Sequence, residues 1–103
     1  MENMNDVALE VVDNEFLRQF ETTIEGKKAK IEYSLQERKI FLTKLIMNEE
    51  LVEKGYEEEF IQAVFSIIEE RNIRLVPTSP EIASFMRKNR RKYKDLLPVG
   101  INI

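Results

Sequence analysis

The spacing of apolar residues changes once along this chain, at Gly55, and that change constrains the fold more than any other feature. Before Gly55, apolar and polar residues largely alternate, as in strands that bury one face. After it, Phe60, Val64 and Ile68 recur at every fourth position with charged residues opposite, which predicts an amphipathic helix. We expect a strand that runs through Lys54–Tyr56 directly into this long helix.

The remaining elements follow from the same patterns and from turn residues. Strands are predicted at Phe20–Ile24, Ala29–Leu35, Lys39–Met47 and Ile73–Val76, with a further one at Ala8–Val12. The long helix should end near Asn72, because asparagine tolerates a left-handed cap. Thr78-Ser79-Pro80-Glu81 has the T-x-x-E pattern of a capping box, so a second helix is predicted from Pro80 to Lys88.

A helix that joins two strands is the usual crossover of a parallel pair. The predicted fold class is therefore α/β (α+β): a mixed sheet with an antiparallel meander, a β-α-β crossover and a C-terminal helix. Where parallel strands diverge, a cleft opens at their carboxyl ends and is a favoured ligand site. In this chain that cleft would be lined by Leu45–Met47, Gly55 and Thr78–Ser79.

Length and composition limit the chemistry. With 103 residues, 43% of them hydrophobic, we expect one domain over residues 1–103, with residues 1–7 disordered and residues 98–103 as a tail. The absence of cysteine and histidine excludes disulfides, thiol nucleophiles, histidine bases and the usual zinc sites, and we expect no metal. The polar, acidic start and the lack of an apolar run near ~20 residues predict no membrane span and a cytoplasmic protein.

Charge is divided unevenly along the chain. Six of the eight residues from Arg87 to Lys94 are basic, whereas everything before Arg87 carries a net charge of −8. This cluster could bind a phosphate, a nucleic-acid backbone, or only solvent. Tyr93 is the one aromatic residue among these cations, which disfavours nucleic acid because single strands need stacking platforms.

Several of these segments together resemble the small, single-domain members of the GCN5-related N-acetyltransferase family. The resemblance covers roughly Glu10 to Leu97 and rests on an ordered series of short matches. They are Phe20, Gly26, Ile31-Glu32-Tyr33, Ile40-Phe41-Leu42-Thr43, Gly55, Val76-Pro77, Pro80 and Tyr93-Lys94-Asp95-Leu96. The resemblance implies an acetyl-coenzyme A-dependent N-acetyltransferase that acts on an amine or protein substrate.

The chain departs from the family in its phosphate-binding loop. Family members carry G-x-G-x-G there, and the matching positions are Glu53, Gly55 and Glu57, so one glycine of three remains. Two like charges ~4 Å apart repel by about 1 kcal/mol in water and about 4 kcal/mol at an effective dielectric of 20. The loop therefore predicts weakened cofactor binding. The alternative is a non-catalytic relative that acts as an interaction module.

The resemblance also implies a set of site residues. The cofactor would be bound by Leu45, Ile46, Met47, Lys54, Gly55, Tyr56, Glu57, Glu58, Arg90 and Arg91, with the amides of Lys54–Glu58 on the diphosphate. Ser79, which stands where resembling members have a cysteine, and Tyr93, which could protonate the leaving thiolate, are the catalytic candidates.

Structural alternatives remain for these residues. Gly55 could be an ordinary turn glycine, Glu57–Glu59 could stabilise the helix dipole, and Ser79 could serve helix capping. Tyr33 alternates onto the apolar face and is expected in the core.

Overall fold

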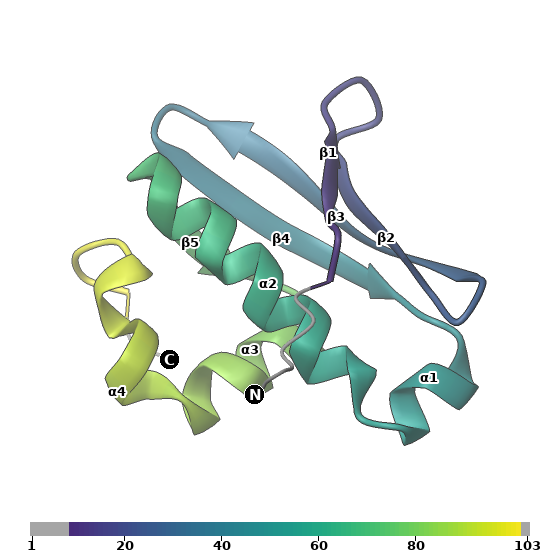
Figure 1. Cartoon of the computed structure of the whole chain (residues 1–103). Coiled ribbons are helices and arrows are strands. Elements are labelled where there is room, and N and C mark those ends of the chain that lie inside the picture. Colours follow the sequence, from purple (N-terminus) through teal and green to yellow (C-terminus); the bar gives the residue numbers. More distant parts are fainter. Residues whose placement is uncertain (1–8, 102–103) are drawn as a thin grey trace, which may run out of the picture.

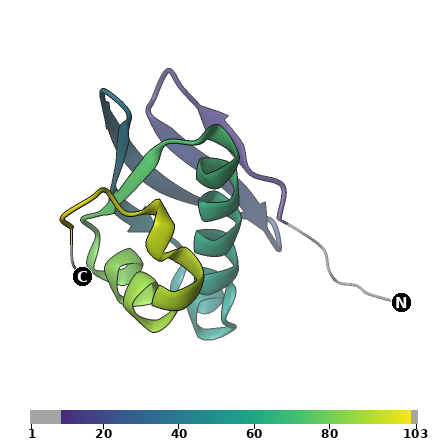
Figure 2. The same cartoon turned by 90° about the vertical axis from the view of Figure 1, so that its left-hand side faces the viewer.

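The computed structural model describes residues 9–101, in which a five-stranded sheet is packed against helices (Figures 1 and 2). The predicted disorder of residues 1–7 lies outside this range. The strands are β1 (Val12–Asn14), β2 (Gln19–Ile24), β3 (Lys27–Gln36), β4 (Lys39–Ile46) and β5 (Arg74–Pro77). The helices are α1 (Glu49–Glu53), α2 (Tyr56–Arg71), α3 (Pro80–Lys88) and α4 (Arg90–Tyr93), and a 3-10 turn, η1 (Lys94–Leu96), follows.

The sheet has the strand order β1-β2-β3-β4-β5. The first four strands pair antiparallel, and β4 pairs parallel with β5, from Lys39 opposite Arg74 to Leu42 opposite Pro77. Helix α2 is the crossover between these two parallel strands (Figure 1). The predicted fold class, a meander followed by a β-α-β crossover and a C-terminal helix, is confirmed.

One face of the sheet carries the hydrophobic core. Phe20, Ile31 and Leu42 project from three neighbouring strands and are fully buried. Phe60 and Phe65 from α2 cover them, and a single cluster of buried side chains continues into α3, α4 and η1. The expected placement of Tyr33 in the core is confirmed, since its side chain is 5% exposed.

The connection between β4 and α2 differs from the prediction. The chain does not pass from strand to helix through Lys54–Tyr56, because the short helix α1 intervenes. Asn48 caps α1 by accepting a hydrogen bond from the amide of Glu50 at its Oδ1 (2.8 Å), and Leu51 fixes the helix by being fully buried. The prediction overlooked this Asn-x-Glu start, which provides a cap and acidic residues in the first turn.

Other boundaries follow from local chemistry. Helix α2 ends at Asn72 in the left-handed conformation (φ 58°), as expected. Helix α3 spans the predicted residues, but the capping box is not formed. Ser79 occupies the cap position without a side-chain cap bond, and the hydroxyl of Thr78 donates instead to the carbonyl of Leu42 (3.0 Å). The expected strand at Ala8–Val12 is displaced, since β1 begins at Val12.

Candidate functional site

The parallel strands β4 and β5 separate at a single carbonyl. The oxygen of Leu42 accepts hydrogen bonds from the amides of Thr78 (3.1 Å) and Ser79 (3.0 Å) and from the hydroxyl of Thr78 (3.0 Å). Beyond this point β4 continues to Ile46 without a partner from β5, as the register shows. The strands therefore form a fork, as the sequence predicted for parallel neighbours that diverge.

The loop between α1 and α2 leaves the start of the longer helix open. Gly55 holds a left-handed conformation (φ 89°) as the N-cap of α2, and it supplies no side chain to bind the first-turn amides. A Cβ atom built on Gly55 would meet no atom within 4 Å. The amides of Tyr56, Glu57 and Glu58 in the first turn are therefore oriented as anion donors, with the positive end of the helix dipole behind them.

Two side chains of this loop bind the β2–β3 turn. Lys54 Nζ lies 2.7 Å from Glu25 Oε1, and the hydroxyl of Tyr56 donates to Glu25 Oε2 at 3.2 Å. The hydrogen bond from Lys54 lowers the pKa of the Glu25 carboxyl, and Glu25 in turn raises the pKa of Lys54. Because all three groups face solvent, this network positions the loop but stabilises the fold little.

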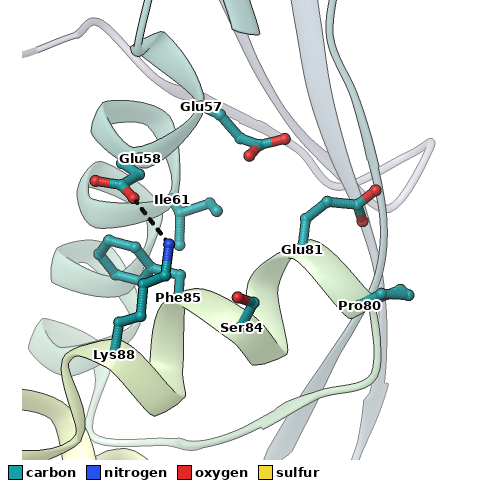
Figure 3. A pocket seen from close by; sticks show the side chains of 8 residues that line it. All are labelled: Glu57, Glu58, Ile61, Pro80, Glu81, Ser84, Phe85 and Lys88. Carbon is teal, nitrogen blue, oxygen red and sulfur yellow. Dashed lines mark ion pairs between the residues drawn. The ribbon is translucent and has the colours of Figure 1, made fainter.

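A cavity of about 290 Å³ opens between the first turn of α2 and the side of α3 (Figure 3). Its lining consists of Glu57, Glu58, Ile61, Pro80, Glu81, Ser84, Phe85 and Lys88. Figure 3 shows carboxylates from both helices around this space, with Lys88 on the far side, its Nζ 4.0 Å from Glu58 Oε2. Apolar surface comes from Ile61, Pro80 and Phe85.

The carboxyl of Glu57 is perturbed in this cavity. Burial raises its pKa above the ordinary value of 4.5, and the charges of Glu81 and Glu58 raise it further. A carboxylate with a raised pKa is a better proton acceptor near neutral pH. The same negative charges would oppose an anion at the start of α2.

The two predicted catalytic residues lie in different surroundings. Ser79 is fully buried, and its hydroxyl donates to Glu81 Oε1 at 2.8 Å, so it reaches the cavity through a carboxylate that lines it. Tyr93 is 4% exposed, and its ring packs edge-on against Phe65, with centroids 5.0 Å apart. Tyr93 is absent from the cavity lining.

The predicted cofactor residues are only partly brought together. Glu57 and Glu58 line the cavity, and Lys54, Gly55 and Tyr56 precede them in the loop. Leu45, Ile46 and Met47 lie at the end of β4, and Ile46 lines a separate cavity of about 640 Å³ beside β1, β2 and β3. Arg90 and Arg91 lie in α4, beyond the cavity.

The site residues predicted from the sequence did not include the residues of α3 that line the cavity. They are Pro80, Glu81, Ser84, Phe85 and Lys88, and the sequence does carry a signal for them. Residues three or four positions apart share one side of a helix, so Glu81, Ser84 and Lys88 form a polar stripe opposite the predicted apolar face.

These features define the class of protein first by its fold. The structure matches the NMR solution structure of a GCN5-like "putative N-acetyltransferase" from Staphylococcus aureus, with a TM-score of 0.64, 20% sequence identity and 92% of each chain covered. At this identity the match shows a shared fold.

The family follows from the sequence itself. Residues 19–96 match the model of the GCN5-related N-acetyl-transferase family, and the chain belongs to that family. A general acetyltransferase function is therefore supported. No curated protein matches this sequence. In the part of the chain that the structure describes, no helix is long and apolar enough to cross a membrane.

Proposed function

We propose that this chain is an acetyl-coenzyme A-dependent N-acetyltransferase whose affinity for the cofactor is lowered by its own carboxylates. One observation carries the proposal: the first turn of α2 has no side-chain cap, and it shares a cavity with Pro80 and Glu81, which follow the fork between β4 and β5. Free amides at a helix start form a favourable site for a diphosphate. The backbone therefore fits the cofactor, while the side chains of Glu57, Glu58 and Glu81 oppose it.

The residues have distinct roles in this proposal. The amides of Tyr56, Glu57 and Glu58 would hold the diphosphate, and the unpaired edge of β4 at Leu45–Met47 would hold the pantetheine arm. Arg90 and Arg91 would bind the 3′-phosphate. The bound coenzyme supplies the activated acetyl group.

Proton transfer would be handled by carboxylates at the cavity. The carboxylate of Glu81, which accepts the hydrogen bond of Ser79, would remove the proton from an acceptor amine, because Glu57 lies at the diphosphate end of the cofactor in this arrangement. Ser79, hydrogen-bonded to Glu81, would orient the acceptor. Tyr93 remains a candidate acid for the leaving thiolate.

Thermal unfolding with increasing acetyl-coenzyme A tests the proposal. Ligand at 100 times its dissociation constant stabilises a fold by roughly 2.7 kcal/mol, which raises the melting temperature measurably. Coenzyme A without the acetyl group should give a comparable shift, because the diphosphate contacts are shared, whereas acetate alone should give none.

The competing function is that of a non-catalytic interaction module, which the three cavity carboxylates favour. An unchanged melting temperature at millimolar acetyl-coenzyme A would support this alternative and contradict the transferase proposal. A higher melting temperature without acetyl transfer to amines would mean that the protein binds the cofactor but does not catalyse the reaction, which would contradict the transferase proposal.

A further inference from the structure

A strongly basic surface covers the end of α3 and the segment that follows. Its members are Arg87, Lys88, Arg90, Arg91, Lys92 and Lys94, and all six side chains are exposed. We call this the C-terminal basic surface. It stands out because the protein as a whole is acidic, with a net charge of −3 and an isoelectric point near 5.1.

Several cations of this surface have a weak carboxylate partner or none among residues 9–101. Lys88 reaches Glu58 only at 4.0 Å, and Lys92 lies over the ring of Tyr93, 5.3 Å from its centroid. Among residues 9–101, no carboxylate lies within ion-pair distance of Arg87, Arg91 or Lys94. Like charges held close together repel one another, so an anionic partner would relieve this repulsion.

The surface is also held rigidly. Tyr93 projects from α4 into the core, where its ring contacts Phe65 of α2 and Phe85 of α3, with centroids 5.0 Å and 5.8 Å apart. Because α4 is fixed in this way, its cations are presented in a defined arrangement. Rigid presentation lowers the entropy cost of binding.

The neighbourhood of the surface excludes long polyanions. Along the axis of α3, Glu81 lies about 10 Å from Lys88, at 1.5 Å per residue. This distance is on the order of one Debye length. Glu57 faces Glu81 across the cavity, and Glu58 lies beside Lys88 (Figure 3). A nucleic acid or an anionic membrane that extends past the cations would meet these carboxylates. Tyr93 is buried and offers no platform for base stacking.

We propose that the C-terminal basic surface binds a short acidic segment of a partner protein. Such a segment can pair with Arg87, Arg91 and Lys94, which do not line the cavity, without reaching the carboxylates there. Arginine is enriched in protein interfaces, and the nearby residues Val99 and Ile101 are exposed apolar side chains that a protein partner could cover. Because Arg90 and Arg91 would also bind the 3′-phosphate of acetyl-coenzyme A, peptide binding is measured without the cofactor, and its outcome is then separate from that of the proposed activity.

Fluorescence anisotropy with a labelled glutamate-rich peptide of about four residues, roughly 14 Å when extended, tests this proposal. We expect saturable binding that weakens as salt rises from about 50 to about 200 mM, and no binding of a glutamine-rich peptide of equal length. Duplex DNA, single-stranded RNA and anionic phospholipid vesicles are titrated in parallel. Tighter binding of any of these, or no binding of the acidic peptide, would overturn the proposal.

A charge-matched pair of variants locates the binding site. The triple variant Arg87→Gln/Arg91→Gln/Lys94→Gln should weaken peptide binding about tenfold, as three exposed ion pairs imply. The control Lys28→Gln/Lys39→Gln/Lys44→Gln removes three exposed cations from the sheet and should leave affinity unchanged. The double variant Arg87→Lys/Arg91→Lys should retain binding. Equal weakening by both triple variants would contradict the proposed location.

Discussion

At the scale of single residues, the charge of Glu57 is expected to have the largest effect on anion binding at the candidate site. Its carboxyl is half-buried at the open start of α2, and its pKa is raised by burial and by Glu81 and Glu58. A carboxyl that is harder to ionise in the fold than in the unfolded chain destabilises the fold once it is charged. Stability therefore falls as the pH rises from the ordinary value of 4.5 through the raised pKa.

The variant Glu57→Gln should bind acetyl-coenzyme A at least about fivefold more tightly at pH 7, because about 1 to 4 kcal/mol of repulsion is removed and 1 kcal/mol corresponds to about fivefold. Titration calorimetry measures this change. Glu59→Gln is the matched control, since Glu59 is exposed in the same turn but absent from the cavity lining. Wild-type affinity should also rise as the pH falls toward the ordinary carboxyl range, and this dependence should be weaker in the variant. Equal effects of the two variants would argue against the cavity as the cofactor site.

A second residue-scale prediction concerns Asp13. The hydroxyl of Tyr33 donates to its Oδ1 at 2.6 Å, and Arg71 Nη1 lies 2.8 Å from its Oδ2 in an ion pair without hydrogen-bond alignment. Asp13→Ala should lower the free energy of unfolding by about 1–3 kcal/mol, because two partly buried partners lose their contact. Glu32→Ala, which removes only the exposed pair with Lys30, should cost less than about 1 kcal/mol in chemical denaturation.

The same contact makes a prediction for alkaline pH. Burial and the hydrogen bond to Asp13 raise the pKa of Tyr33 from 10.0 to about 12. Its stabilising contribution is complete below pH 10 and is lost as the pH rises toward 12, where the folded tyrosine also ionises. In Asp13→Ala the folded pKa of Tyr33 should lie closer to 10, so this loss should be smaller and should level off at lower pH, which thermal unfolding between these values would detect.

At the scale of elements, Gly55 joins two helices through a conformation that other residues adopt only with strain. Gly55→Ala should destabilise the fold by roughly 1–2 kcal/mol from its φ of 89° alone, because its Cβ would meet no neighbouring atom. Gly55→Asn should cost less, since asparagine tolerates this region. Melting temperatures of the two variants check this order. A loss of acetyl-coenzyme A affinity common to both variants would indicate that the ligand approaches the glycine closely.

Local sequence was sufficient for the elements with strong periodicity. Alternation in Ala29–Leu35 and the four-residue spacing of Phe60, Val64 and Ile68 predicted β3 and α2. The prediction missed helix α1 because five residues are too few to show a helical period. The local signal for this helix was its N-cap residue, Asn48. Thr78 was misassigned because its hydroxyl donates to the carbonyl of Leu42 instead of accepting from a helix amide, and this contact between distant residues is encoded by no local pattern.

At the scale of the whole molecule, the aromatic cluster of Phe65, Phe85 and Tyr93 joins three helices into one body. Tyr93→Ala should lower the free energy of unfolding by about 3–5 kcal/mol through the cavity it leaves. Tyr93→Phe keeps the ring and should cost about 1 kcal/mol or less. Calorimetric unfolding distinguishes the two variants. If Tyr93→Phe unfolds like the wild type but loses acetyl transfer, the hydroxyl acts in catalysis. Retained transfer would leave Tyr93 a structural residue.

The sequence predicted the topology more fully than it predicted the candidate site. Strand pairing and the crossover followed from periodicity and chain direction, which are properties of whole segments. The cavity depends on which side of α3 faces the start of α2, and hence on the angle between two helices. The positions of Glu81, Ser84 and Lys88 against Glu57 became visible only in three dimensions (Figure 3).

The carbonyl oxygen of Leu42 accepts three hydrogen bonds, so the stability of the fork does not depend on the side chains that line the cavity. Three donors from Thr78 and Ser79 join the two chain segments at the vertex of the fork without any contribution from a ligand. Substitutions of the residues that line the cavity should therefore change cofactor affinity while the fold stays intact.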